Sequence, residues 1–357
     1  MKKMKKFQLN KNKKNNFLTY GMIIVVYIIM QTLLSTGNVS SLLGGLLVPL
    51  CMYAIAAVSL NLVVGFSGEL SLGQAGFMCV GAYSSALFSN LVGDAMPAGI
   101  RFFCAIIIGA LVAGIFGILI GIPVLRLKGD YLAIVTLAFG EIIKNLINVV
   151  TLGKDKAGLH LSFTSSAGLN MDDSGEVIID GALGITGTPR DANFTIGVIL
   201  LLITVAVVLN LVHSRSGRAI TAIRDNRIAA ESIGLNITKY KLMAFAISTT
   251  LAGMAGVLYA HNLSSLTVKI FNYNTSILIL VFVVLGGIGN IRGSIIAAVV
   301  LTALPELLRE LSTYRMLIYA ILLIAMMLFN WAPAAINFRE RVAAKIKAKK
   351  KNQKEAA

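Results

Sequence analysis

The sequence is poor in charge and in cysteine. Only 13% of its 357 residues are charged and 57% are apolar, whereas soluble domains carry about 25% charged residues. This shortage excludes a soluble domain large enough to hold a core of its own. Cys51, Cys79 and Cys104 all fall inside apolar segments. We interpret them as buried thiols, which excludes a disulfide framework or a cysteine metal site.

Motifs of catalysis and nucleotide binding are also missing. The sequence contains no HExxH, GxSxG or GxxxxGK(S/T) motif, and His160, His213 and His261 are scattered along it. We therefore expect no metal, no cofactor and no enzymatic activity. The missing phosphate loop has a further consequence: if ATP drives this protein, another chain must bind it.

Long apolar runs are the dominant feature. A helix needs about 20 apolar residues to cross a membrane. The runs predict an all-α, polytopic transmembrane helical bundle with about ten spans, at residues 17–35, 42–65, 70–91, 101–125, 130–150, 193–213, 240–261, 274–289, 293–308 and 314–332.

The net charge of +16 is concentrated at the two ends of the chain. Residues 1–17 carry seven lysines and no acid, and residues 339–357 carry eight basic and two acidic residues. Basic segments beside apolar helices indicate the cytoplasmic side and contacts with membrane lipids, and no nucleic-acid partner is expected. We therefore predict cytoplasmic tails at residues 1–16 and 336–357, and a transmembrane permease domain at 17–335.

The loop at residues 151–192 differs in composition from the other loops. It is rich in Gly, Ser, Thr and Asp and holds three basic and six acidic residues. With the N-terminus inside, ten spans place this loop outside and the basic loops inside. Its length indicates a functional or partly disordered outer loop.

A polar loop at residues 214–240 has five positive and two negative charges. Gly217 and Gly234 bracket a pattern in which apolar residues recur at helical spacing. These residues are Ala219, Ile220, Ile223, Ala229, Ala230 and Ile233. The pattern predicts two short amphipathic helices under the membrane that dock a cytoplasmic partner. The alternative is a plain basic linker.

The second and third spans are joined by GFSGELSLGQAGF, residues 65–77. Small residues let helices pack closely, and glycine permits a helix break where the backbone is buried or lines a cavity. Either a tight helical hairpin or a broken segment along a translocation path is therefore possible. The path candidates here are Gly65, Ser67, Gly68, Ser71, Gly73 and Gln74.

Glu141 lies in the middle of an apolar span, with Lys144, Asn145 and Asn148 on the same helix face. Ionisable groups at this depth are costly unless they are paired or hydrated. One interpretation is a Glu141–Lys144 pair at a helix interface. The other is a polar stripe along a path, for which Glu141 and Asn145 are our candidates.

Four segments resemble the branched-chain amino acid ABC permeases, of the second, longer type. They are NLVVGFSGELSLGQAGFMCVGAYSSA, LRLKGDYLAIVTLAFGE, GRAITAIRDNRIAAESIGLNITKYKLMAFAISTTLAGMAGVLYA and VLGGIGNIRG. The resemblance runs from residue 42 to 332. It departs at residues 151–159, TLGKDKAGL, where the family often has Gly-Gly followed by Gly-Leu. The outer loop is also longer than usual for the family.

The resemblance implies the permease subunit of an ATP-driven importer for leucine, isoleucine and valine in a prokaryotic cell membrane. The implied partners are a second permease, two ABC ATPase subunits and an external substrate-binding protein. Residues 214–240 would then form the coupling loop that touches the ATPase and drives alternating access. Our candidate contacts are Arg218, Ala222, Arg224, Asp225, Glu231, Ser232 and Gly234.

Two alternatives remain. A related ABC permease for urea, short amides or a sugar would use the same fold and the same coupling loop. An ion-driven secondary transporter would instead need an ion site of its own, and a docking loop would have no purpose in it.

Overall fold

The computed structural model describes residues 2–37, 41–127, 129–155, 158–163, 169, 175–308 and a few positions between 314 and 328. The chain divides into two compact units, Met1–Val299 and Val300–Ala357. The elements discussed below belong to the first unit, apart from the end of the last helix.

Helices account for nine of the ten predicted spans. They are α1 (Lys2–Ser35), α2 (Ser41–Asn61) continued by the π-helix η1 (Leu62–Ser67), α3 (Gln74–Val92), α4 (Ala98–Val124), α5 (Asp130–Val149), α6 (Phe194–His213), α9 (Ile237–Ala260), α10 (Tyr273–Gly286) and α11 (Ile291–Leu307). Among the described residues, seven helices are long and apolar enough to cross a membrane, and α10 is shorter. The predicted span at 314–332 lies mostly outside the described residues.

The predicted first span matches the apolar part of α1, Phe17–Ser35. The helix itself begins earlier, at Lys2, because lysine is a good helix former and the apolar run is only the end of the helix. The third helix begins at Gln74 rather than at residue 70. Residues 68–73 are not helical, since Gly68 takes a φ of +74° that ends the preceding helix.

The core is built around α9, which packs against α2, α3 and α4. Glycines allow these helices to approach closely. A Cβ atom on Gly81 of α3 would lie 2.4 Å from the carbonyl oxygen of Gly253 in α9, and one on Gly256 would lie 2.0 Å from that of Met78. Cys51 and Cys79 are buried as predicted, but Cys104 is only partly buried, because it lies on α4, several of whose neighbouring side chains are exposed.

The predicted outer loop is folded into strands, so the all-α prediction is correct for the bundle and incomplete for the chain. The strands are β1 (Thr151–Lys154), β2 (Leu159–Ser162), β3 (Glu176–Asp180), β4 (Gly184–Thr186) and β5 (Ser265–Leu266). They form an antiparallel sheet in the order β2-β1-β3-β4-β5. Ile185, paired with Leu266, is fully buried and anchors the sheet.

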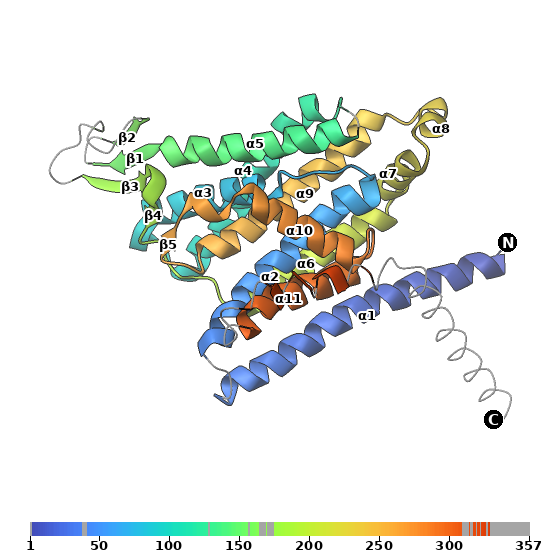
Figure 1. Cartoon of the computed structure of the whole chain (residues 1–357), viewed down its shortest axis with the longest axis horizontal. Helices are drawn as coiled ribbons and strands as arrows, with labels where there is room; N and C mark the ends of the chain where they lie inside the picture. Colours follow the sequence, from blue (N-terminus) through green and yellow to red (C-terminus); the bar gives the residue numbers. More distant parts are fainter. Residues whose placement is uncertain are drawn as a thin grey trace. The chain divides into compact units, whose positions relative to one another are not determined.

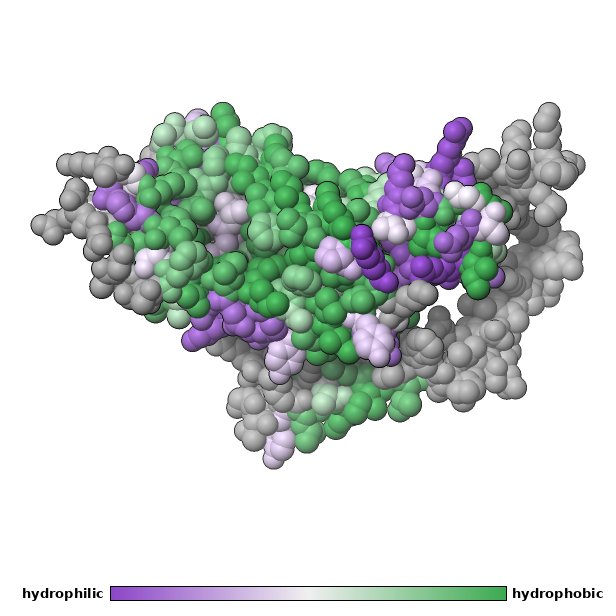
Figure 2. Space-filling view, turned by 90° about the horizontal axis from the view of Figure 1, so that it is seen from above, coloured by the Kyte–Doolittle hydropathy of each residue, from purple (hydrophilic) through white to green (hydrophobic). Residues whose placement is uncertain are grey.

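The sheet and the polar loop lie at opposite ends of the first unit (Figure 1). Lys154 Nζ donates to the Leu91 carbonyl, which places the sheet at the end of α3. The polar loop forms α7 (Arg215–Asp225) and α8 (Arg227–Ser232). In Figure 2, hydrophilic residues gather toward the two ends of the visible face and a hydrophobic surface lies between them. A bilayer-sized apolar band with polar ends is the pattern expected of a membrane protein.

Candidate translocation and coupling site

The segment between α2 and α3 is a genuine helix break, as one of the two interpretations predicted. We use "helix break" for residues 62–73, which comprise η1 and the non-helical stretch after it. A π-helix inside a longer helix often occurs at a functional site. Here the backbone must approach its neighbours closely: a Cβ on Gly65 would lie 2.4 Å from the Gly289 nitrogen, and one on Gly73 would lie 2.5 Å from the Thr136 carbonyl oxygen.

Polar groups tie the helix break to the bundle. The Leu72 N–H donates to Thr136 Oγ1 of α5 at 3.0 Å, and the Ala75 N–H donates to Ser276 Oγ of α10 at 3.0 Å. Glu69 forms a largely buried ion pair with Lys241 of α9. The ion pair and the hydrogen bonds stabilise irregular backbone at membrane depth, which is tolerated only where the protein supplies partners.

The path candidates of this segment have different surroundings. Gln74 Nε2 donates to Ser59 Oγ at 2.6 Å, inside the bundle. Ser67 is buried. Ser71 is also buried, and its hydroxyl has no hydrogen-bond partner among the described residues. Gly68 is exposed. The break therefore does not present its polar side chains as one continuous stripe.

Glu141 lies at a small pocket between the helix break, α5 and the start of α10. The lining residues are Leu72, Gly76, Leu137, Gly140, Glu141, Phe271, Asn272, Tyr273 and Ser276. Glu141 is thus the path candidate that lines this pocket, and the neighbouring Leu72 and Gly76 bring the region of the helix break to it. Asn145, one turn further along α5, is exposed.

Two interactions hold the Glu141 carboxylate. Lys144 donates to it as an i, i+3 ion pair, and the Tyr273 N–H at the start of α10 donates to Oε1 at 2.9 Å. A helix N-terminus stabilises a carboxylate through its free N–H groups and its dipole. The predicted Glu141–Lys144 pair is therefore present. Of the two residues, Glu141 lines the pocket, and a role in transport stays a prediction.

The coupling loop (residues 214–240) contains the two short helices that its pattern predicted. Side-chain caps begin them: Ser214 Oγ accepts from the Gly217 N–H, and Asn226 Oδ1 accepts from the Ala229 N–H. Ile223, Ala230 and Ile237 pack into a small apolar cluster beneath the loop. The loop is thus a folded helical protrusion (the knob, residues 214–240) and not an extended linker.

Two details of the predicted pattern are wrong. Gly217 lies inside α7 instead of bracketing it, because the helix begins at the Ser214 cap. Ala229 and Ile233 are predicted to lie on the apolar face, yet Ala229 is exposed and the side chain of Ile233 is 74% exposed, since α8 has only six residues and ends at Ser232. Gly234 does follow the helix, with a φ of +83°.

The seven candidate coupling residues all lie on the exposed surface of this loop. Arg224 differs from the rest because its guanidinium turns back to the helix break, where Nη1 donates to the Gly65 carbonyl at 2.8 Å. The predicted contacts leave out two exposed apolar residues of the loop, Ile228 (81% exposed) and Ile233. A signal for Ile228 existed, namely an isoleucine outside the predicted apolar pattern.

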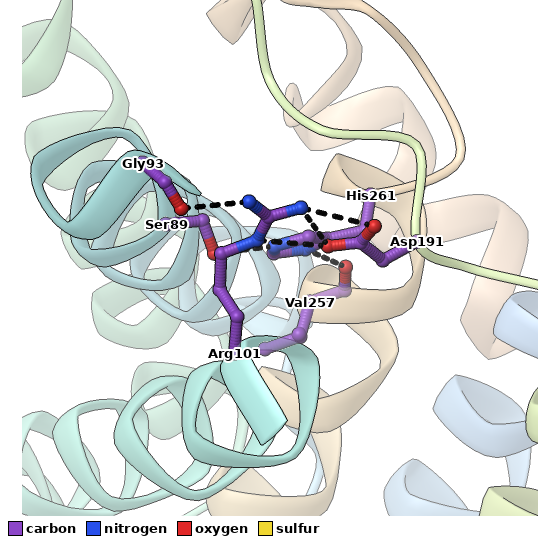
Figure 3. A network of polar contacts seen from close by, with 6 residues as sticks. All are labelled: Ser89, Gly93, Arg101, Asp191, Val257 and His261. Atoms are coloured by element: carbon purple, nitrogen blue, oxygen red, sulfur yellow. Dashed lines mark hydrogen bonds and ion pairs between the residues drawn. The ribbon is translucent and has the colours of Figure 1, made fainter. Parts of the chain in front are cut away.

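Figure 3 shows a second polar cluster, at the end of α3 that also carries the sheet. We call it the outer junction, because we expect this end to face outward. It consists of Ser89, Gly93, Arg101, Asp191 and His261. The Arg101 guanidinium donates to both carboxylate oxygens of Asp191, at 2.9 and 3.2 Å, and to the Gly93 carbonyl at 2.8 Å. Sequence reasoning did not find this cluster, because its members are far apart in the chain.

His261 completes the outer junction. Its Nδ1 is 3.1 Å from the Val257 carbonyl oxygen and its Nε2 is 2.9 Å from Ser89 Oγ. Because a carbonyl only accepts, the proton lies on Nδ1, and a neutral ring then accepts at Nε2 from the serine hydroxyl. The junction joins the ends of α3, α4 and α9 to the segment before α6. Elsewhere too, the described residues contain no group of three or more His, Cys, Asp or Glu placed to hold a metal ion.

A bundle of long apolar helices, with a helix break beside a small pocket and a folded basic loop at one end, is the architecture of a multi-pass membrane protein. The chain belongs to the family of permease components of branched-chain amino acid transport systems, whose family model matches residues 42–329.

Three relatives illustrate the range of similarity. The chain is 36% identical over 294 residues to the high-affinity branched-chain amino acid transport system permease protein LivM of Salmonella typhimurium, covering 80% of this chain and 67% of the relative. It is 35% identical to LivM of Escherichia coli, with the same coverage. It is 25% identical over 312 residues to the fructose import permease protein FruG of Bifidobacterium longum, covering 85% of each chain. No solved structure gives a significant match.

Proposed function

We propose that this chain is the permease subunit of an ATP-driven ABC importer that carries leucine, isoleucine and valine across a prokaryotic cell membrane. The main support is its membership of the permease family, with 36% identity to a branched-chain amino acid permease. The substrate would be delivered by an external binding protein. A second permease subunit and two ATPase subunits would complete the transporter.

The proposed topology has about ten spans, with both termini in the cytoplasm. Residues 17–335 would form the permease domain, between the tails at 1–16 and 336–357. The lysine-rich N-terminal tail and the coupling loop belong to the same side by the positive-inside rule. The sheet lies at the opposite end of the first unit (Figure 1), so we place it outside, where a loaded binding protein would dock.

Docking of the ATPase is assigned to the coupling loop. The chain has no phosphate loop of its own, so ATP hydrolysis belongs to partner chains. Ile228 and Ile233 are exposed at the tip of the knob, and apolar side chains in such a position are typical of an interaction surface. They extend the predicted contact set of Arg218, Ala222, Arg224, Asp225, Glu231, Ser232 and Gly234.

The translocation path is assigned to the pocket between the helix break, α5 and α10. Glu141 lines this pocket, and its ion-pair partner Lys144 adds a charge of the opposite sign beside it. An amino acid in its zwitterionic form would find both of its charges matched there. Alternating access would open and close this region as the ATPases push on the coupling loop.

The rival ABC interpretation is a permease that imports a sugar. It is considered because the fructose permease FruG aligns over 85% of the chain. Its 25% identity is lower than the 36% of LivM, which favours amino acids. An ion-driven carrier is the rival of a different class, and it leaves the folded coupling loop without a purpose.

Uptake of labelled leucine by cells with and without the chain tests the proposal. We expect uptake to need the chain, to stop on ATP depletion and to survive collapse of the proton gradient, and we expect isoleucine and valine to compete. Uptake that follows the gradient would instead indicate a secondary carrier. Chain-dependent uptake of fructose or ribose, without uptake of leucine, would indicate a sugar permease.

A further inference from the structure

The geometry points to Arg224 as a positioning residue that carries movement of the coupling loop into the helix break, and from there to the pocket. This inference rests on the proposed function and adds a route inside the chain. It reassigns Arg224, which we first expected to touch the ATPase, to a contact within the permease.

The guanidinium of Arg224 serves two partners at once. Nε and Nη2 donate to Asp225 Oδ1 at 3.0 and 2.8 Å, while Nη1 donates to the Gly65 carbonyl at 2.8 Å. The last carbonyls of a helix lack partners within the helix, so Arg224 supplies a donor near the end of η1. Only the planar fork of arginine can hold a carboxylate and a separate carbonyl in this way, which a lysine ammonium group on a flexible stem does not reproduce.

The stem of Arg224 lies directly on the helix break. A Cβ on Gly68 would be 2.6 Å from Arg224 Cγ. Gly68 also has a φ of +74°, which favours glycine. The contact between the coupling loop and the break therefore depends on a hydrogen bond at Gly65 and on a steric fit at Gly68.

The helix break is attached in turn to the walls of the pocket. Beyond Gly68, the Leu72 N–H donates a hydrogen bond to Thr136 Oγ1 of α5. The Ala75 N–H, at the start of α3, donates one to Ser276 Oγ of α10. Leu72 and Ser276 both line the pocket. A displacement of α7 thus reaches the pocket through one short stretch of backbone. A contiguous packed route of this kind is a physical basis for coupling, which a perturbation at Arg224 can test.

The experiment uses the assembled transporter, purified through a tag on this chain. Leu70, in the helix break, is 37% exposed and is replaced by cysteine as a reporter. Cys104 is replaced by serine, while Cys51 and Cys79 are buried and remain. The rate of maleimide labelling at residue 70 is measured with and without a non-hydrolysable ATP analogue.

With Arg224 in place, the analogue should change the labelling rate. In Arg224→Lys the nucleotide-induced change should shrink by about fivefold or more, as expected when an allosteric coupling is lost, while the ATPase still copurifies. Gly68→Ala should have the same effect. The matched controls are Arg215→Lys in the same loop and Gly44→Ala in α2, where an added Cβ meets nothing within 4 Å; both should keep the full response.

A full response in Arg224→Lys would overturn the proposal, and so would loss of the ATPase from that variant, which would make Arg224 a docking residue. The proposed function fails differently. A wild-type complex that shows the labelling response but does not import leucine would support the role of Arg224 and reject leucine as the substrate. A wild-type chain with which no ATPase copurifies would reject both the role of Arg224 and the proposed function.

Discussion

The two ends of the bundle each hold an arginine–aspartate pair, and the pairs are built differently. At the outer junction, the Arg101 and Asp191 side chains are 8% and 13% exposed, and they come from separate elements. At the coupling loop, Arg224 and Asp225 are neighbours whose side chains are 38% and 66% exposed. Breaking a buried pair leaves an uncompensated charge, whereas an exposed pair is worth little. By this measure the Arg224–Asp225 pair is more easily rearranged than the pair at the outer junction, although the end with the coupling loop also holds the largely buried Glu69–Lys241 pair.

The two ends differ in the continuity of their helices and not in the closeness of their glycine contacts. Close glycine contacts at Gly81, Gly253 and Gly256 join α3 to α9 below the outer junction. At the other end, the helix break interrupts the path from α2 to α3, and Arg224 reaches it through a single hydrogen bond. We therefore expect the movement driven by the ATPase to be greatest at the helix break and smallest at the outer junction.

The largest expected effect is on the glycine packing. Gly256→Val would put side-chain atoms where a Cβ alone is already 2.0 Å from the Met78 carbonyl oxygen. Ordinary overpacking costs about 1–3 kcal/mol, but here Cβ alone already overlaps backbone, so α3 and α9 cannot pack as they do and most of the chain should fail to elute as a single species from gel filtration in detergent. Gly99→Val is the control, because a Cβ there meets nothing within 4 Å. Equal recovery of the two variants would show that this packing is not tight.

The buried ion pair should come next. Arg101→Met leaves Asp191 buried without its partner and should cost about 3–5 kcal/mol of unfolding free energy, seen as a lower melting temperature of the purified chain. The double variant Arg101→Met, Asp191→Leu removes both charges and should recover most of the loss. If the double variant melts no higher than the single one, the junction is stabilised by something other than charge pairing.

A substitution on the surface of the coupling loop should weaken assembly with the ATPase and leave the fold of this chain intact. Replacing Ile228 and Ile233 together by serine should cost about 1–3 kcal/mol of binding, roughly tenfold or more in the amount of ATPase that copurifies. The melting temperature of the chain should not move. Thr238→Ala, an exposed change in the same loop, is the control. Unchanged copurification would place the docking contact elsewhere.

The smallest expected effect is at the pocket. Glu141→Gln keeps the shape and removes the charge, and leucine uptake should fall about fivefold, because one partner of a charge-assisted contact is lost. Protein yield and melting temperature should be close to those of the wild type. Unchanged transport together with unchanged stability would reject a pathway role for Glu141 and leave it as a packing pair.

The features that the sequence predicts correctly are local. The length of the apolar runs predicts the helices, the glycines at 65, 68 and 73 indicate the break, and the Glu141–Lys144 pair follows from helical spacing. Each of these features depends on residues that are close in sequence. For that reason the helical architecture and the existence of the coupling knob could be inferred before any coordinates.

The features that the sequence does not reveal are long-range. The sheet closes through the pairing of Ile185 with Leu266, and the outer junction joins Ser89, Arg101, Asp191 and His261. No local pattern encodes such contacts. The error at Ile233 has another cause, because α8 has six residues, too few to define a face by periodicity.

The most direct test of the account is hydrogen–deuterium exchange of the assembled transporter with and without a non-hydrolysable ATP analogue. We expect protection to change in peptides covering residues 62–73 and 215–240, and to stay the same in peptides covering the outer junction at residues 89–101 and 257–261. A change in protection at the outer junction, with none at the helix break, would contradict the account. The part that moves would then be the one that the buried Arg101–Asp191 pair stabilises.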